Sequence, residues 1–148
     1  ADMITMHAVG GIPMMEAAQN AVDNAGCDTA TLAITVLTSM NAETLAATGV
    51  TRELTDQVKT LAKCAAEAGL SGVVASPQEA AMLREVLGPD ALIVTPGVRP
   101  AGAALGDQSR VATPKAAFDA GASHIVVGRP ITQADDPVAA FEAIAAEL

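Results

Sequence analysis

The chain has 148 residues, of which 51% are hydrophobic, with two phenylalanines and neither tyrosine nor tryptophan. Eight Lys and Arg residues oppose 17 Asp and Glu residues, and the formal net charge of -9 excludes general affinity for nucleic acid polymers or anionic membranes. The length fits one domain over residues 1–148, and no apolar run reaches membrane-spanning length, so we expect a cytoplasmic protein without membrane contact.

Short apolar runs alternate with amphipathic segments along the whole chain. The apolar runs predict strands at 3–7, 32–37, 72–75, 92–95 and 125–127, and the amphipathic segments predict helices at 13–25, 53–68, 77–87, 114–120 and 137–148. Likely N-cap types precede three helices that begin with proline, at Ser76, Thr113 and Asp136. Glycines follow four of the helices, as is typical of helix ends: Gly26, Gly69, Gly88 and Gly121.

This alternation is typical of the α/β class, in which the strands form a parallel sheet. Right-handed crossovers bring the carboxyl ends of all strands to one edge of such a sheet, where ligand sites collect. The residues that directly follow each strand are therefore the candidates for function.

The last predicted strand is followed directly by Gly128, Arg129 and a proline. A glycine lets a ligand approach the backbone closely, and the planar guanidinium of Arg129 is suited to phosphate oxygens. Gln108 and Arg110, in the long loop before this strand, could close over the same anion. The pattern predicts a phosphate site, and the alternative is an ion pair between Arg129 and a surface carboxylate.

Other polar residues also follow predicted strands. Thr38 and Ser39 either hydrogen-bond a ligand or cap the next segment, and His7 is either an acid–base group or a structural histidine. Arg99 lies in the constrained sequence Pro-Gly-Val-Arg-Pro, which favours a fixed position for its side chain. We find no paired catalytic carboxylates, metal-ligand cluster or nucleophile triad in the sequence. The residues by themselves therefore predict a phosphate-ligand site with no catalytic group and no metal.

Six motifs stand at these strand ends: His-Ala…Gly-Gly at 7–11, Val-Leu-Thr-Ser-Met at 36–40, Gly-Val-Val-Ala-Ser at 72–76, Thr-Pro-Gly-Val-Arg-Pro at 95–100, Gly-Asp-Gln…Arg at 106–110 and Val-Gly-Arg-Pro-Ile-Thr at 127–132. In this order, and across nearly the whole chain, they resemble the motifs of bacterial orotidine 5'-phosphate decarboxylase. The resemblance implies a TIM (βα)8 barrel, usually dimeric. It also implies conversion of orotidine 5'-monophosphate (OMP) to UMP and CO2, in pyrimidine biosynthesis, without a metal or organic cofactor.

The same resemblance implies roles for individual residues. Gln108 and Arg129 match the phosphate ligands of the family, assisted by the backbone amides of Gly128 and Arg129. Thr38 matches the residue at the pyrimidine edge, Pro96 matches the wall beside the base, and Arg99 matches a loop arginine near the phosphate.

The sequence departs from the family in one large respect. The family's chemistry rests on an Asp-x-Lys-x-x-Asp motif after its third strand, whose lysine protonates the carbanion-like centre. That motif does not occur in the 148 residues, and Lys59, Lys63 and Lys115 lie on predicted helices, where none can replace it. We therefore expect the C-terminal (βα)5 portion of the barrel, lacking three N-terminal βα units. It would supply phosphate and base binding and would be inactive by itself.

Two kinds of assembly follow from this expectation. In one, the chain works in a decarboxylase, as a homodimer or together with the missing N-terminal part. In the other, it is a non-catalytic phosphate-ligand module that self-associates, because an open sheet exposes two edges and an apolar face. Hexulose-phosphate synthases and ribulose-phosphate epimerases match less well, since Leu-Thr-Ser-Met and Gly-Asp-Gln…Arg favour the decarboxylase.

Overall fold

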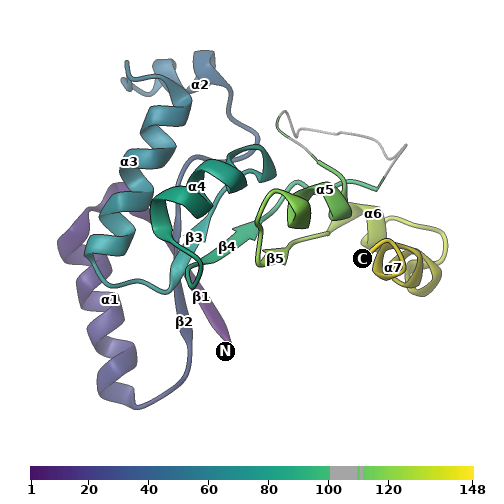
Figure 1. Cartoon of the computed structure of the whole chain (residues 1–148), viewed down its shortest axis with the longest axis horizontal. Helices are drawn as coiled ribbons and strands as arrows, with labels where there is room; N and C mark the ends of the chain where they lie inside the picture. Colours follow the sequence, from purple (N-terminus) through teal and green to yellow (C-terminus); the bar gives the residue numbers. More distant parts are fainter. Residues whose placement is uncertain (101–109, 111) are drawn as a thin grey trace.

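A computed structural model describes residues 1–100, 110 and 112–148, and within them five strands form one parallel sheet (Figure 1). The strands lie side by side in chain order: β1 (Met3–His7), β2 (Ala30–Ile34), β3 (Gly72–Val74), β4 (Leu92–Thr95) and β5 (His124–Ile125). The expected α/β class and parallel sheet of five βα units are therefore confirmed.

The helices follow the strands as the sequence predicts: α1 (Ile12–Ala25), α3 (Leu54–Glu67), α4 (Ala80–Leu87), α5 (Pro114–Asp119) and α7 (Pro137–Ala145). Four short elements were not predicted: the 3-10 turns η1 (Ala8–Gly10) and η2 (Pro77–Glu79), and the helices α2 (Ala42–Ala47) and α6 (Arg129–Thr132). The turn η2 occupies the start of the predicted helix 77–87. A proline in the first turn of α6 explains how a helix can begin directly after Gly128.

Three predicted strands extend beyond the ends of the observed ones, and the smallest difference is at 72–75, where β3 ends at Val74. We expected a strand at 32–37, but β2 ends at Ile34, because its neighbour β3 ends at Val74 and offers no further ladder partner. Beyond β2, the amide of Thr35 still donates to Val74 O at 3.1 Å, and the chain then turns, with Met40 N donating to Leu37 O at 2.9 Å. We expected the last strand at 125–127, but β5 covers only His124–Ile125.

The strand register places the functional edge of the sheet. The last residues of β1, β2 and β3 and the next-to-last residue of β4 are consecutive partners across the sheet: His7, Ile34, Val74 and Val94. Because all strands are parallel and follow one another in chain order, the segments after them emerge at the same edge. Residues from distant parts of the sequence therefore meet there.

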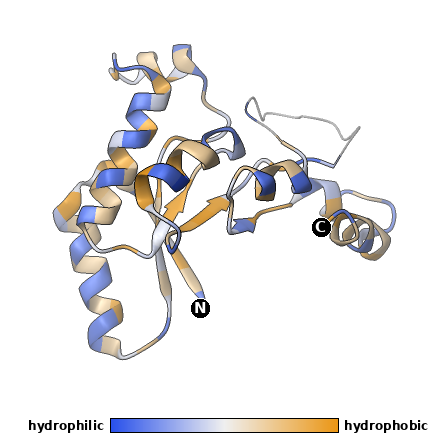
Figure 2. Cartoon of the chain, in the orientation of Figure 1, coloured by the Kyte–Doolittle hydropathy of each residue, from blue (hydrophilic) through white to orange (hydrophobic). Residues whose placement is uncertain are grey.

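The core lies between the sheet and its helices. The helix α3 buries a stripe with helical spacing: Val58, Leu61, Ala62 and Ala65. This stripe belongs to the same buried cluster as Val73 of β3 and Ile93 of β4, both of which are fully buried. Figure 2 shows the contrast between the hydrophobic strands β3 and β4 and the mixed surface of α3.

Side-chain caps begin several helices. Ser76 accepts from Gln78 N at 3.2 Å, Thr113 from Ala116 N at 3.3 Å, and Asp136 from Val138 N at 3.0 Å, which confirms the three predicted N-caps. The backbone at the predicted stop Gly121 has a φ of 103°, a conformation that favours glycine. These local signals fix where the βα units begin and end.

Arg84 of α4 forms hydrogen bonds with two loops at the amino edge of the sheet. Its guanidinium donates to Gly88 O at 2.8 Å and Ala91 O at 2.7 Å in the loop before β4. It also donates to Gly121 O at 2.9 Å in the turn before β5. One side chain therefore satisfies carbonyl groups from two successive helix-to-strand connections.

We expect Arg84→Met to lower the free energy of unfolding by about 2–3 kcal/mol, because hydrogen bonds from a charged donor are lost and carbonyls lose their partner. Urea denaturation followed by circular dichroism measures this difference. Arg52→Met is the matched control: Arg52 is exposed and donates to Thr60 in an exposed hydrogen bond, so we expect a change within about 0.5 kcal/mol. Equal effects of the two substitutions would contradict the structural role of Arg84.

Both edge strands leave apolar side chains in contact with solvent. Within the described residues, β1 pairs with β2 alone and β5 with β4 alone. Ile4 of β1 is 37% exposed, and Val126, just after β5, is 48% exposed. The helix α7, at the end of the molecule away from α1 (Figure 1), exposes Val138 and Phe141. None of the described helices has the length and apolar character needed to cross a membrane.

Candidate functional site

A pocket of about 280 Å³ opens where β2, β3 and β4 end. Two of the residues singled out in the sequence, Thr38 and Pro96, lie in its wall, although 58 positions separate them along the chain. The other lining residues are mostly apolar: Ile34, Val36, Leu37, Ser39, Val74 and Ala75. Apolar walls with hydroxyl groups on one side suit a flat, uncharged ring with a polar edge.

Local structure holds the two predicted base contacts in place. Thr38 lies inside the turn that Met40 N closes on Leu37 O, and the capped helix α2 begins shortly afterwards. Pro96 follows Thr95, whose buried hydroxyl donates to His124 O at 3.3 Å and so joins β4 to β5. Pro96 therefore follows a hydrogen-bonded strand end directly, and Thr38 follows one after a few residues.

Gly128 and Arg129 lie at the start of α6, after β5, and both are exposed. They share the carboxyl edge of the sheet with the pocket, because β5 is parallel to the other strands. A side chain at Gly128 would meet no atom within 4 Å, so the backbone there is open to a ligand. Neither residue lines the pocket of Thr38 and Pro96.

Arg99 is largely buried, at 7% exposure. Its amide donates to Ala112 O at 3.0 Å, and its guanidinium donates to Val98 O at 2.8 Å. Arg99 is thus buried and hydrogen-bonded at the base of the segment between β4 and α5, and its role in a ligand site stays a prediction. Gln108, the other predicted phosphate ligand, lies outside the described residues.

The structure places Arg110 differently from the sequence-based expectation. Its guanidinium forms an ion pair with the carboxylate of Glu79, where the sequence suggested a ligand phosphate, and it donates to Leu37 O at 2.9 Å and Val36 O at 3.2 Å. Burial lowers the pKa of the Arg110 guanidinium, because the charged form loses hydration. Sequence reasoning missed the role of Glu79, although Ser-Pro-Gln-Glu at 76–79 is a capping-box pattern that marks it.

His7, the last residue of β1, is exposed and lines a second pocket of about 380 Å³, whose mainly apolar walls come from the segment after β2, from α2 and from α3. Val36 and Leu37 line both pockets, so the segment that follows β2 contributes to the walls of each. In the described residues, no group of three or more His, Cys, Asp or Glu side chains could hold a metal ion.

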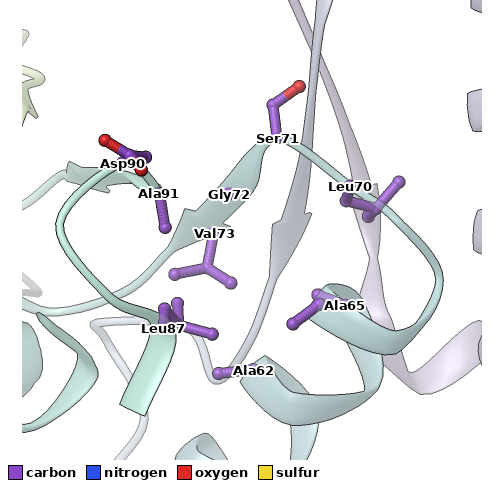
Figure 3. A pocket seen from close by; sticks show the side chains of 10 residues that line it. Ala62, Ala65, Leu70, Ser71, Gly72, Val73, Leu87, Asp90 and Ala91 are labelled. Carbon is purple, nitrogen blue, oxygen red and sulfur yellow. The ribbon is translucent and has the colours of Figure 1, made fainter. Parts of the chain in front are cut away.

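A third pocket, of about 270 Å³, lies at the opposite edge of the sheet, between α3 and α4 (Figure 3). Small and apolar residues dominate its lining, with Gly72 and Val73 at the start of β3 and Ala62 and Ala65 on α3. Its polar residues are few, and the hydroxyl of Ser71 accepts from Thr31 N at 3.2 Å. This pocket reflects close strand–helix packing with small side chains.

Comparison with known proteins agrees with this geometry. A profile of the Orotidine 5'-phosphate decarboxylase / HUMPS family matches residues 1–144. The orotidine 5'-phosphate decarboxylase of Thermobifida fusca (strain YX) is 54% identical over 145 residues, covering 98% of this chain and 60% of that protein. The enzyme of the same name from Halorhodospira halophila (strain DSM 244 / SL1) is 56% identical over 146 residues, covering 99% of this chain and 62% of that protein.

A solved structure gives the same result in three dimensions. The crystal structure of orotidine 5'-phosphate decarboxylase from Lactobacillus acidophilus superposes with a TM-score of 0.82 at 42% identity, covering 98% of this chain and 62% of that one. The chain thus spans about three fifths of the length of these relatives, and its sheet is a (βα)5 portion of their TIM barrel. The chain belongs to the orotidine 5'-phosphate decarboxylase / HUMPS family.

Proposed function

We propose that residues 1–148 form one domain that supplies the nucleotide-binding part of an orotidine 5'-monophosphate decarboxylase. The observation that carries this proposal is the convergence of Thr38 and Pro96 in one pocket, on the sheet edge that also bears Gly128 and Arg129. An apolar pocket beside a backbone–guanidinium site matches a nucleotide, which joins a flat base to a phosphate.

Each part of the site has a distinct role in this proposal. The hydroxyl of Thr38 contacts the polar edge of the pyrimidine, and the ring of Pro96 packs beside the base. Arg129 and the amides of Gly128 and Arg129 bind the phosphate, together with Gln108. Arg99 braces the segment near the phosphate from its buried position. We assign no catalytic role to any of these side chains.

The whole protein would convert OMP to UMP and CO2, with the reacting groups on an Asp-x-Lys-x-x-Asp segment outside residues 1–148. That segment would reach the site from the open edge at β1 or β5, where apolar side chains are exposed. Either the remaining part of the barrel or a second copy would cover these edges. We place the activity in the cytoplasm, because a charged nucleotide does not cross a bilayer unaided.

We expect Arg129→Ala to weaken UMP binding by roughly 10–150-fold, the equivalent of one or two charge-assisted hydrogen bonds. Isothermal titration calorimetry of the chain with UMP measures the change. Lys115→Ala is the control, because it also removes one positive charge, from an exposed ion pair with Asp119 on α5. Unchanged UMP affinity in Arg129→Ala, or an equal loss in Lys115→Ala, would refute the assignment of the phosphate site.

A non-catalytic module that self-associates remains the second proposal, favoured by the exposed apolar residues at both sheet edges and on α7. Sedimentation equilibrium with and without UMP separates the two proposals. Three results together would favour the module. The 148-residue chain would self-associate into a stable closed oligomer, it would bind phosphate ligands, and added Asp-x-Lys-x-x-Asp segments would give no gain of turnover.

A further inference from the structure

Arg110 joins the ends of two strands through its side chain. The guanidinium is ion-paired with Glu79 of η2, after β3, and donates to the carbonyls of Val36 and Leu37, after β2. Arg110 and Glu79 are both buried, at 8% and 5% exposure. The contacts span 31 residues toward Glu79 and 73 residues toward Leu37, so they connect three separate βα units.

The backbone of Arg110 is fixed at the same place. The hydroxyl of Ser76 donates to Arg110 O at 3.0 Å. Glu79, in turn, accepts from Ser76 N at 2.9 Å through the carboxylate oxygen that does not contact Arg110. Arg110, Ser76 and Glu79 therefore form one closed network in which both the side chain and the main chain of Arg110 have defined partners.

Burial of such a pair contributes little net stability, because the loss of hydration offsets the attraction between the charges. A network of this kind acts mainly by fixing geometry. What it fixes here is the wall of the base pocket: Leu37 precedes Thr38 directly, and Ala75, which precedes Ser76, lines the same pocket.

We propose that Arg110, through its hydrogen bonds to Val36 O and Leu37 O, is a positioning residue that sets Thr38 against the opposite wall of the base pocket. This inference rests on the proposed function. It differs from the role as an anion contact that the sequence suggests for Arg110, because the guanidinium reaches the base side of the site. Loss of Arg110 would therefore weaken recognition of the base and leave the phosphate contacts in place.

Two variants separate this positioning role from stability. Glu79→Gln keeps an acceptor for Ser76 N and keeps Arg110 on the carbonyls of Val36 and Leu37, but leaves the arginine charge buried without its carboxylate. We expect its thermal unfolding midpoint to fall by about 6–10 °C, with UMP affinity within about threefold of wild type. The double variant Glu79→Gln/Arg110→Met removes the buried charge and recovers most of that stability, yet it loses the carbonyl contacts.

The ligand experiment compares UMP with ribose 5-phosphate, which has the phosphate but no base. We expect the double variant to bind UMP roughly tenfold more weakly, the equivalent of one hydrogen bond to the base. The affinity of the double variant for ribose 5-phosphate should stay within about twofold of the wild-type affinity. Equal losses for both ligands would mean that Arg110 serves the phosphate, and unchanged affinity for both would mean that it serves packing alone; either result overturns the proposal.

Hydrogen exchange tests the same idea without a ligand. The Met40 amide donates to Leu37 O in the turn that contains Thr38. We expect it to exchange at least about tenfold faster in the double variant than in the less stable Glu79→Gln, because the turn has lost its anchor. Equal or slower exchange overturns the inference. Failure of the wild-type chain to bind either ligand would refute the proposed function instead, and the exchange result would still decide the role of Arg110.

Discussion

The 148-residue chain should leave orotidine 5'-monophosphate unchanged, and turnover should appear only when a polypeptide carrying the family's Asp-x-Lys-x-x-Asp motif is added. The proposed site binds the base and the phosphate but has no group that can protonate the carbanion-like centre. A positioned general acid and its electrostatic partners together contribute at least about 10⁴-fold in rate. We therefore expect a gain of at least that size over the chain alone, measured by the loss of OMP absorbance.

The experiment requires control of the sample and of the added polypeptide. Intact mass should show a single species of 14.8 kDa, free of longer polypeptides, before the assay. The control polypeptide carries alanine in place of the motif's lysine and should give no turnover, although it can still associate. Turnover by the mass-verified chain without any addition would contradict the division of roles that we propose.

We expect Gly72→Ala to lower the free energy of unfolding by at least about 3 kcal/mol. An added methyl group would overlap the carbonyl oxygen of Leu92 on the neighbouring strand and would lie 2.7 Å from Cβ of the same residue. A carbonyl within a paired strand cannot move aside without breaking the ladder between β3 and β4. The loss is a large part of the total stability of a domain of this size, which is typically about 5–15 kcal/mol.

Urea denaturation of the wild type and variants measures this effect. Gly128→Ala is the matched control for stability, because a methyl group there would meet no atom within 4 Å. We expect its unfolding free energy to stay within about 0.5 kcal/mol of wild type. A Gly72→Ala midpoint equal to that of Gly128→Ala would show that β3 and β4 can separate enough to admit a side chain, contrary to the packing described here.

Much of the fold could be predicted from the sequence, because the signals involved are local. Apolar runs place the strands, and the caps at Ser76, Thr113 and Asp136 fix helix starts through contacts two or three residues away. The strand β2 was predicted too long, since its end depends on where its neighbour β3 stops. The short helix α6 was missed because Gly-Arg-Pro fits both a loop and a first helical turn.

The sequence by itself determined the α/β class, the family motifs and the candidates Thr38, Pro96 and Arg129. Only the tertiary structure decided which candidates meet: Thr38 and Pro96 share a pocket, whereas Arg129 begins α6 and does not line that pocket. The destination of Arg110 shows the physical reason. An arginine side chain pairs with whatever acceptors the fold brings within reach, and its partners Glu79 and Leu37 are 31 and 73 residues away in sequence. Residue type and spacing carry no information about such contacts until the order of the strands in the sheet is known.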